Sequence, residues 1–526
     1  MRDQEFQHIP AQFWVYTMLP FVVVAITLAG IRTHNPFLFG FIGVVPFIFL
    51  LVNRIDLWFI TTICVYNSSL RIPGILGQLE LVHVLIAGLT GVVFLRFIIR
   101  KKGHPRHSAL WKFIYMFAAV LLVTMVVRGA GFRFLGDNKW GGMRYVDLML
   151  MLLFPFVVSH LRISSSQWKT AIVWMSILAL IPFFSDLLYI LSNGAVYQHF
   201  YLIKHGGVGR ALQTYGSEEV ATRLRSGAGA GWAMLVLPYF LFALNLRNVP
   251  KYIPFITAGF ILTGLSGHRL GIINSVAFVW GYGFFINKGR RIGFVMASML
   301  LAAMGLGLTI VLAPHLPLAI QRSISFLPFV HVDIGVAHEA AGTVSWRLQV
   351  WKNAIYEIPT FWLLGKGYAF DPTLLTSLTA NNSTVDWARI TVAYHSGPLS
   401  LLIGMGVLGL IAGLGVLVAA VVRHYRISVG PWCDVTLQRF HNILFVIFII
   451  GAVRFLLLYG DVQVSFPGFF KTLALLEGLS LANLHEIRKR DEDGNEVTRG
   501  KPIRSSIVPN SRSSFPRNQG YALTPQ

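Results

Sequence analysis

The chain has 526 residues, of which 55% are hydrophobic and only 13% are charged. Soluble globular proteins carry about 25% charged residues, so this composition excludes an ordinary soluble domain and favours a membrane protein. The net charge of +22 does not indicate nucleic-acid binding, because lysine and arginine are scattered in short segments between apolar runs. Membrane insertion and anionic lipids favour that distribution, so the expected partner is a lipid bilayer and no nucleic acid.

Apolar runs long enough to cross about 30 Å of hydrocarbon recur along the chain. They predict about 12 to 14 transmembrane helices, and therefore an all-α polytopic membrane protein. The runs at 57–72 and 252–266 are short for spans. In chain order, the candidate spans lie at 13–31, 37–52, 57–72, 79–98, 112–127, 145–161, 169–191, 229–246, 252–266, 270–286, 292–313, 396–422, 441–460 and 467–484.

The distribution of basic residues predicts that the amino terminus lies inside. The segments 128–144, 192–228 and 314–395 then lie outside, and 314–395 is expected to form helices over the membrane surface. Residues 485–526 are polar and rich in Ser, Pro and Arg, which predicts a disordered basic cytoplasmic tail after an integral membrane domain at 1–484.

Four basic or titratable residues fall on the predicted outer side, namely Arg225, Arg269, Arg347 and His395. Arginine offers a planar fork of donors that suits phosphate oxygens, so the three arginines favour a diphosphate at the membrane surface. The alternative for each arginine is interfacial snorkelling or an ion pair with an outer acid. Those acids are Glu218, Glu219, Asp333 and Glu339.

His395 ends the long outer segment, where a polar stretch meets an apolar run. A histidine with a reference pKa near 6.5 can act as a general base, although an ordinary interfacial histidine is the alternative. The glycines of the following run, from Gly404 to Gly415, are expected mainly to let membrane helices approach closely. Cys64 and Cys433 lie too far apart in the sequence to indicate a disulfide framework or a metal site.

The outer segments resemble the O-antigen ligases and the related polysaccharide polymerases. His395-Ser396 is followed by nine residues and then by Gly406-Val407-Leu408-Gly409, which matches the ligase pattern at the end of the large periplasmic loop. "SWRLQVWKNAIYEIPTFWLLGKGYAF" resembles the loop signature of both groups, and "RSGAGAGWAML" and "LSGHRLGIINS" resemble two other arginine-bearing segments. The Pro-Asn that usually follows the glycine of the first of these segments is replaced here by Ala-Gly-Ala-Gly-Trp.

The resemblance implies a GT-C-type glycosyltransferase in the bacterial inner membrane with its active site on the periplasmic side. It would move a glycan from undecaprenyl diphosphate to a lipid or glycan acceptor hydroxyl, with inversion at the sugar carbon and without a cofactor. His395 would be the base, while Arg225, Arg269 and Arg347 would bind the diphosphate. Metal-independent chemistry is expected because the outer acids are dispersed. Further partners would be envelope polysaccharide-assembly proteins.

Three alternatives to an O-antigen ligase remain. One is a polymerase that extends a repeat-unit polysaccharide, and a second is a protein-glycosylating relative. From a different class, a transporter or channel would use the intramembrane Arg454, Asp147 and Asp186 as an ion path.

Overall fold

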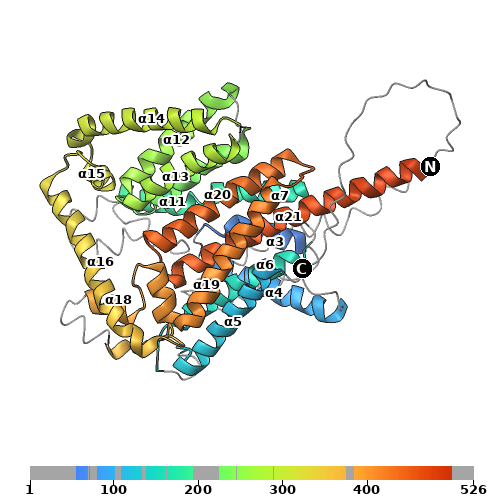
Figure 1. Cartoon of the computed structure of the whole chain (residues 1–526), viewed down its shortest axis with the longest axis horizontal. Coiled ribbons are helices and arrows are strands. Elements are labelled where there is room, and N and C mark those ends of the chain that lie inside the picture. Colours follow the sequence, from blue (N-terminus) through green and yellow to red (C-terminus); the bar gives the residue numbers. More distant parts are fainter. Residues whose placement is uncertain are drawn as a thin grey trace.

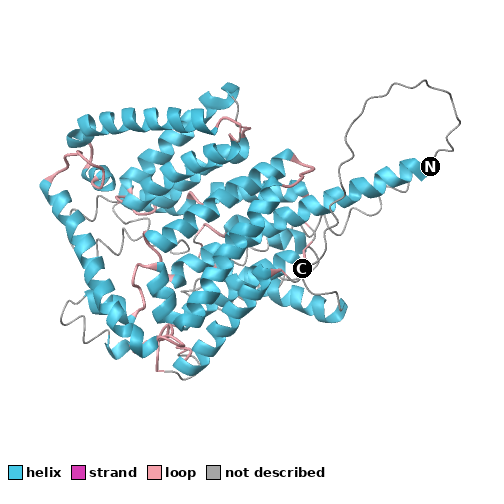
Figure 2. Cartoon of the chain, in the orientation of Figure 1, coloured by secondary structure: helices cyan, strands magenta, loops and turns pink. Residues whose placement is uncertain are grey.

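The structure is a computed structural model, and it describes the helical core of the chain and the large loop. Every regular secondary-structure element in the described part of the chain is a helix (Figure 2). The candidate spans at 13–31 and 37–52 lie outside the described residues, as do Glu218 and Glu219. The described residues are 55–68, 70, 80–100, 108–132, 138–161, 163–192, 224–243, 246–287, 289–374 and 384–499.

The first group of helices precedes the second outer segment. The candidate span at 169–191 consists of two helices, because the regular helix is interrupted at Ala179 and Leu180, immediately before a helix with proline in its first turn. These helices are α3 (Ile55–Val65), α4 (Leu81–Arg100), α5 (Ala109–Arg128), α6 (Gly142–Ser159), α7 (Ser165–Leu178) and α8 (Ile181–Leu191).

The second group contains the large loop and the remaining spans. In chain order it comprises α11 (Gly227–Leu241), η3 (Leu246–Asn248), α12 (Val249–Leu265), α13 (Arg269–Ile286), α14 (Arg291–Leu312), η4 (Ala313–His315), α15 (Leu318–Ile324), α16 (Ile334–Phe361), α18 (Thr384–Ile390), α19 (Gly397–Val429), α20 (Val435–Leu457) and α21 (Val462–Arg499).

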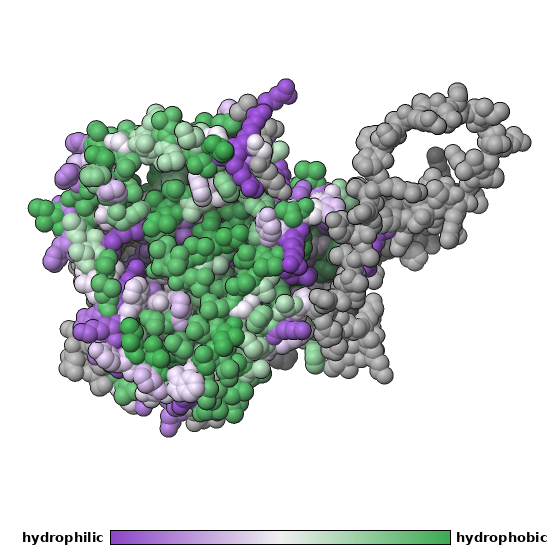
Figure 3. All heavy atoms as spheres, in the orientation of Figure 1, coloured by the Kyte–Doolittle hydropathy of each residue, from purple (hydrophilic) through white to green (hydrophobic). Residues whose placement is uncertain are grey.

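The protein is a multi-pass membrane protein. Seven helical stretches of the described chain are long and apolar enough to cross a membrane, and four shorter apolar helices accompany them. Each candidate span among the described residues lies mainly on one α-helix, except 169–191, which lies on the two helices α7 and α8. Apolar side chains cover most of the middle of the face in Figure 3, as expected of a surface in contact with lipid. α14 is apolar on all sides and buries none of its residues, which fits a helix at the lipid boundary.

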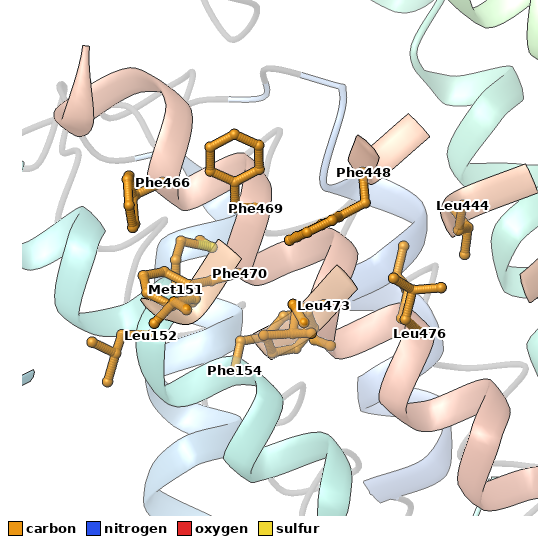
Figure 4. Packing of buried hydrophobic residues seen from close by; sticks show 14 of the residues in the cluster. Met151, Leu152, Phe154, Leu444, Phe448, Phe466, Phe469, Phe470, Leu473 and Leu476 are labelled. Carbon is orange, nitrogen blue, oxygen red and sulfur yellow. The ribbon is translucent and has the colours of Figure 1, made fainter. Parts of the chain in front are cut away.

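Aromatic and aliphatic side chains form the core where α6, α20 and α21 meet (Figure 4). Phe466 stacks on Phe117 of α5 at a centroid distance of 4.8 Å, and its ring also meets Phe455 of α20 edge-on. Such aromatic pairs prefer these defined geometries, so they fix a helix in position as well as burying area. The beginning of α21 is therefore held rigidly against α5 and α20.

The large loop forms helices, as expected. α16 runs along one end of the bundle, at the left in Figure 1, and α21 leaves the bundle at the other end. Asp333 caps α16, because its carboxylate accepts hydrogen bonds from the N–H groups of Gly335 and Val336. Residues 485–499 differ from the prediction of a disordered tail, since α21 continues to Arg499. The remainder of the predicted tail, 500–526, lies outside the described residues. Charged residues spaced three or four apart suit a solvated helix, which explains why a polar segment extends the span.

Candidate functional site

His395 is held by Asp461 through both its backbone and its ring. The His395 N–H donates to Oδ1 of Asp461 at 2.8 Å, and Nδ1 lies 2.7 Å from Oδ2 of the same carboxylate. Asp461 is buried, with only 2% of its side chain exposed. A carboxylate can only accept, so Nδ1 carries a proton, and in the neutral imidazole Nε2 keeps its lone pair. This is the arrangement that a general base requires.

The backbone of His395 is in the left-handed region, with φ of 54°. Residues other than glycine adopt this conformation at a cost that the surrounding structure must offset. Here the N–H bond to Asp461 holds the turn, which points the ring towards the α20–α21 connection.

Asp461 was not identified from the sequence as a site residue. It follows α20 after a short connection, 66 positions beyond His395, and no local pattern joins the two. The available signal was topological, because an acid between the candidate spans 441–460 and 467–484 is expected on the same outer side as His395.

Two small side chains allow α19 to begin beside that connection. Gly397 lies against the carbonyl oxygen and ring of Phe455 in α20, where a Cβ atom would collide. Ser400 then accepts a hydrogen bond at Oγ from the N–H of Val462, the first residue of α21, at 3.1 Å. These two contacts bring His395 and Asp461 together.

Aromatic rings enclose the imidazole and link it to Arg347. The His395 ring stacks on Tyr459 at a centroid distance of 4.8 Å, and Trp346 lies 5.4 Å away. The guanidinium carbon of Arg347 lies 5.4 Å from the centre of the Tyr459 ring. Burial raises the pKa of Tyr459 and Asp461 adds to the effect, while the cations Arg347 and Arg454 oppose it. The Tyr459 hydroxyl therefore stays neutral, and its ring lies among Asp461, Arg347 and Arg454.

Arg269 and Arg347 lie close enough for their positive charges to interact. Nη2 of Arg269 and Nε of Arg347 are buried without a hydrogen-bond partner among the described residues. Two acids weighed as alternative partners are used elsewhere, since Asp333 caps α16 and Glu339 pairs with Arg322. An unpaired guanidinium N–H is costly to bury, so this pair is suited to receive an anion.

Arg225 lies near this cluster but is more open to solvent. The backbone before α11 meets the end of α12, because the N–H of Leu224 donates to the carbonyl oxygen of Leu265 at 3.3 Å. This contact places Arg225 beside the turn that leads into Arg269. Its side chain is exposed, and none of the described contacts joins it to His395 or Arg347.

The segment before His395 is anchored by Glu357, a buried acid of α16. Tyr394 donates its hydroxyl to Oε2 of Glu357 at 2.7 Å, and Arg389 donates Nε to Oε1 at 2.7 Å. Burial and the contact with Glu357 raise the pKa of Tyr394. Arg389 also pairs with Asp386. Glu357 and Asp386 thus hold the loop together.

The Gly-x-Gly of the loop signature packs on a break in α19. Gly406 has φ of 74° and ψ of −174°, which is not helical, so α19 consists of two helical pieces. The N–H groups of Lys366 and Gly367 donate to the carbonyl oxygens of Ile403 and Gly404 at 2.7 and 3.0 Å. The loop therefore satisfies carbonyl groups that the break leaves without helical partners.

The role predicted for the glycines of this run is correct only in part. Gly415 meets the Phe113 ring of α5 and Gly413 meets Phe466 of α21, which is helix packing as expected. Gly404 instead faces Tyr368, and Gly406 faces the Leu363 carbonyl, both from the loop. The glycine pattern thus serves the loop as well as the helices.

Replacement of Gly406 by alanine is expected to lower thermal stability. The added Cβ would collide with the Leu363 carbonyl, and the backbone conformation is nearly restricted to glycine, at a cost of about 1–3 kcal/mol from the backbone alone. The melting temperature in detergent measures this. Gly305→Ala on α14 is the matched control, since no atom lies within 4 Å of the position that its methyl group would take. Equal melting temperatures of the Gly406→Ala and Gly305→Ala variants would contradict the expectation that position 406 requires glycine.

The residues proposed for an ion path do not form one cluster. Asp147 pairs with His83 at 2.9 Å, whereas Arg454 lies beside Tyr459 at the end of α20. Asp186 is buried in α8. The charges thus belong to separate parts of the described bundle, which weakens the transporter alternative.

Within the described ranges, no three His, Cys, Asp or Glu side chains gather as a metal-binding group. The expectation of metal-independent chemistry stays a prediction. A scan against protein-family models finds no match, and neither does a search of the curated proteins. The function is therefore inferred from the geometry around His395 and from the four segments that resemble the ligases.

Proposed function

We propose that the protein is an inverting glycosyltransferase of the O-antigen ligase type with a GT-C-type fold. It acts at the periplasmic face of the bacterial inner membrane on a glycan linked to undecaprenyl diphosphate. The observation that carries this proposal is the His395–Asp461 pair beside two arginines whose buried N–H groups have no partner among the described residues. A base and a pair of arginine N–H donors side by side are the two parts that this transfer requires.

The reaction needs one proton acceptor and stabilisation of one leaving group. The acceptor hydroxyl attacks the anomeric carbon, and its proton passes to Nε2 of His395. The bond from that carbon to the diphosphate oxygen breaks, and its electron pair stays on the diphosphate. Asp461 stabilises the imidazolium that forms, as a buried carboxylate does for the histidine of a catalytic triad. Attack opposite the leaving group inverts the sugar carbon.

Arg269 and Arg347 hold the diphosphate and stabilise the charge that develops as the bond breaks. Their guanidinium groups are already in place without a described acid, so little reorganisation is needed. Arg225, which is exposed, contributes a more distant contact to the donor.

Reconstitution tests the activity and separates the ligase from the polymerase. The purified protein in liposomes receives undecaprenyl-diphosphate-linked glycan with either lipid A-core or a second lipid-linked repeat unit as acceptor. Transfer to lipid A-core in the presence of a chelator is expected. Transfer only to the repeat unit would make the protein a polymerase, and no transfer to either would contradict the proposed function.

Lysine in place of Arg269 or Arg347 is expected to reduce transfer about tenfold or more at limiting donor. Lysine keeps the charge but loses the planar fork, and a hydrogen bond to a charged group is worth about 1.5–3 kcal/mol. Arg225→Lys should have a smaller effect because that side chain is exposed. Initial rates at low donor concentration measure the difference. Equal rates for wild type and the Arg269 and Arg347 variants would refute bidentate binding.

The orientation predicts that α16 is accessible from outside and the α11–α12 connection from inside. Single cysteines at Ser345 and Arg247, both exposed, are introduced in a protein without Cys64 and Cys433. An impermeant maleimide should label the Ser345→Cys variant in intact cells and the Arg247→Cys variant only after lysis. The reverse pattern would move the site to the cytoplasmic face and exclude the proposed reaction there.

A further inference from the structure

Arg454 lies in the last turn of α20, immediately before the α20–α21 connection, which contains Tyr459 and Asp461. The carbonyl oxygen of Arg454 accepts hydrogen bonds from the N–H groups of Leu458 and Tyr459 at 2.9 and 2.8 Å. The helix therefore ends, and the chain turns, immediately after Arg454. Its Nε atom is buried and has no hydrogen-bond partner among the described residues. An always-charged guanidinium in a membrane helix normally pairs with an anion or lines a functional path.

The charges around Tyr459 do not balance within the described chain. Arg347 and Arg454 both act on the Tyr459 ring, and Arg269 lies near Arg347. The opposing carboxylate is Asp461, and both of its oxygens are engaged by His395. The cluster is therefore suited to a ligand that carries two or more negative charges.

Snorkelling does not explain the enclosed Nε atom of Arg454. A snorkelling arginine extends along the lipid-facing surface and keeps its head group in water. Arg454 is half-buried, and its Nε atom is enclosed. Its position suits a ligand that enters the bundle end from the membrane side.

We propose that Arg454 binds the phosphate of the donor that is attached to the polyprenyl chain. This inference rests on the proposed function. In a lipid-linked diphosphate, the lipid-bearing phosphate lies nearer the hydrocarbon than the sugar-bearing phosphate. Arg454 is within α20, whereas Arg347 belongs to α16, which lies outside the bundle at its end. Each of the two arginines therefore binds one phosphate. Arg454 binds the lipid-bearing phosphate, and Arg347 binds the sugar-bearing phosphate beside His395.

Binding of two glycan-free probes tests this division. Undecaprenyl monophosphate carries only the lipid-bearing phosphate, while undecaprenyl diphosphate carries both. Arg454→Gln should weaken binding of both probes by about 10- to 100-fold, the range for losing a hydrogen bond to a charged group. Arg347→Gln should weaken the diphosphate by a similar factor and the monophosphate by much less. Arg454→Lys should restore only part of the affinity, because the fork is lost.

The matched control is Arg439→Gln, which removes the same charge from the other end of α20. Arg439 donates to the Phe240 carbonyl at 3.0 Å and lies away from Tyr459. This variant should bind both probes as wild type does. If wild type binds the probes and transfers glycan while both Arg454 variants bind like wild type, the role of Arg454 is refuted and the proposed function stands. If wild type neither binds the probes nor transfers glycan, the proposed function fails with it.

Discussion

His395→Ala is expected to lower the turnover number by about 10²–10⁴-fold, the usual range for loss of a general base. The acceptor hydroxyl would then lose its proton to water without an oriented acceptor. Donor affinity should change little, because Arg269 and Arg347 make that contact in the proposed site. The measurement is transfer by the purified variant at saturating donor and acceptor, together with a donor-binding assay.

The unusual backbone of His395 calls for a second variant. Its φ of 54° is better tolerated by asparagine than by alanine, so His395→Asn should keep the fold while removing the base. Ser396→Ala is the matched control next to it, because the Ser396 side chain makes no capping bond in the described structure. A folded His395→Asn protein that turns over within a few-fold of wild type would exclude His395 as the base.

Asp461→Asn is expected to reduce turnover by about 10²-fold or more, although the side chain keeps its size. An asparagine amide can donate to Nδ1 of His395, which would move the ring proton to Nε2 and block the base. The same exchange in a serine protease triad has a large effect for this reason. Donor affinity should again be preserved, and so should the melting temperature, since the amide oxygen still accepts from the His395 N–H.

Asp386→Asn is the control for Asp461→Asn. It removes another loop carboxylate from a contact with Arg389, but Glu357 still binds that arginine. Its turnover should stay near that of wild type. Because Asp461 acts through His395, the double variant Asp461→Asn/His395→Asn should be no slower than His395→Asn alone. Additive losses in the double variant would show that Asp461 acts separately from His395.

The sequence alone determined the membrane class and most helix positions. Long apolar runs have few stable alternatives in lipid, because every backbone polar group must be satisfied within the segment. Helices such as α5, α13 and α20 therefore lie close to their predicted spans. Alternation of the spans also predicted that Arg269, Arg347 and His395 share one end of the bundle.

Only the tertiary structure decided which groups meet at that end. Asp461 reaches His395 because Gly397 permits close contact with Phe455 and Ser400 joins Val462, contacts made between residues of different helices. The break at Gly406 likewise depends on a loop distant in sequence, whose N–H groups bind the free carbonyls. Hydropathy reports how a segment partitions between water and lipid, and that energy is nearly the same whichever neighbour the segment packs against. Hydrogen bonds and close packing are short-ranged, so pairings across the bundle appear only once the chain has folded.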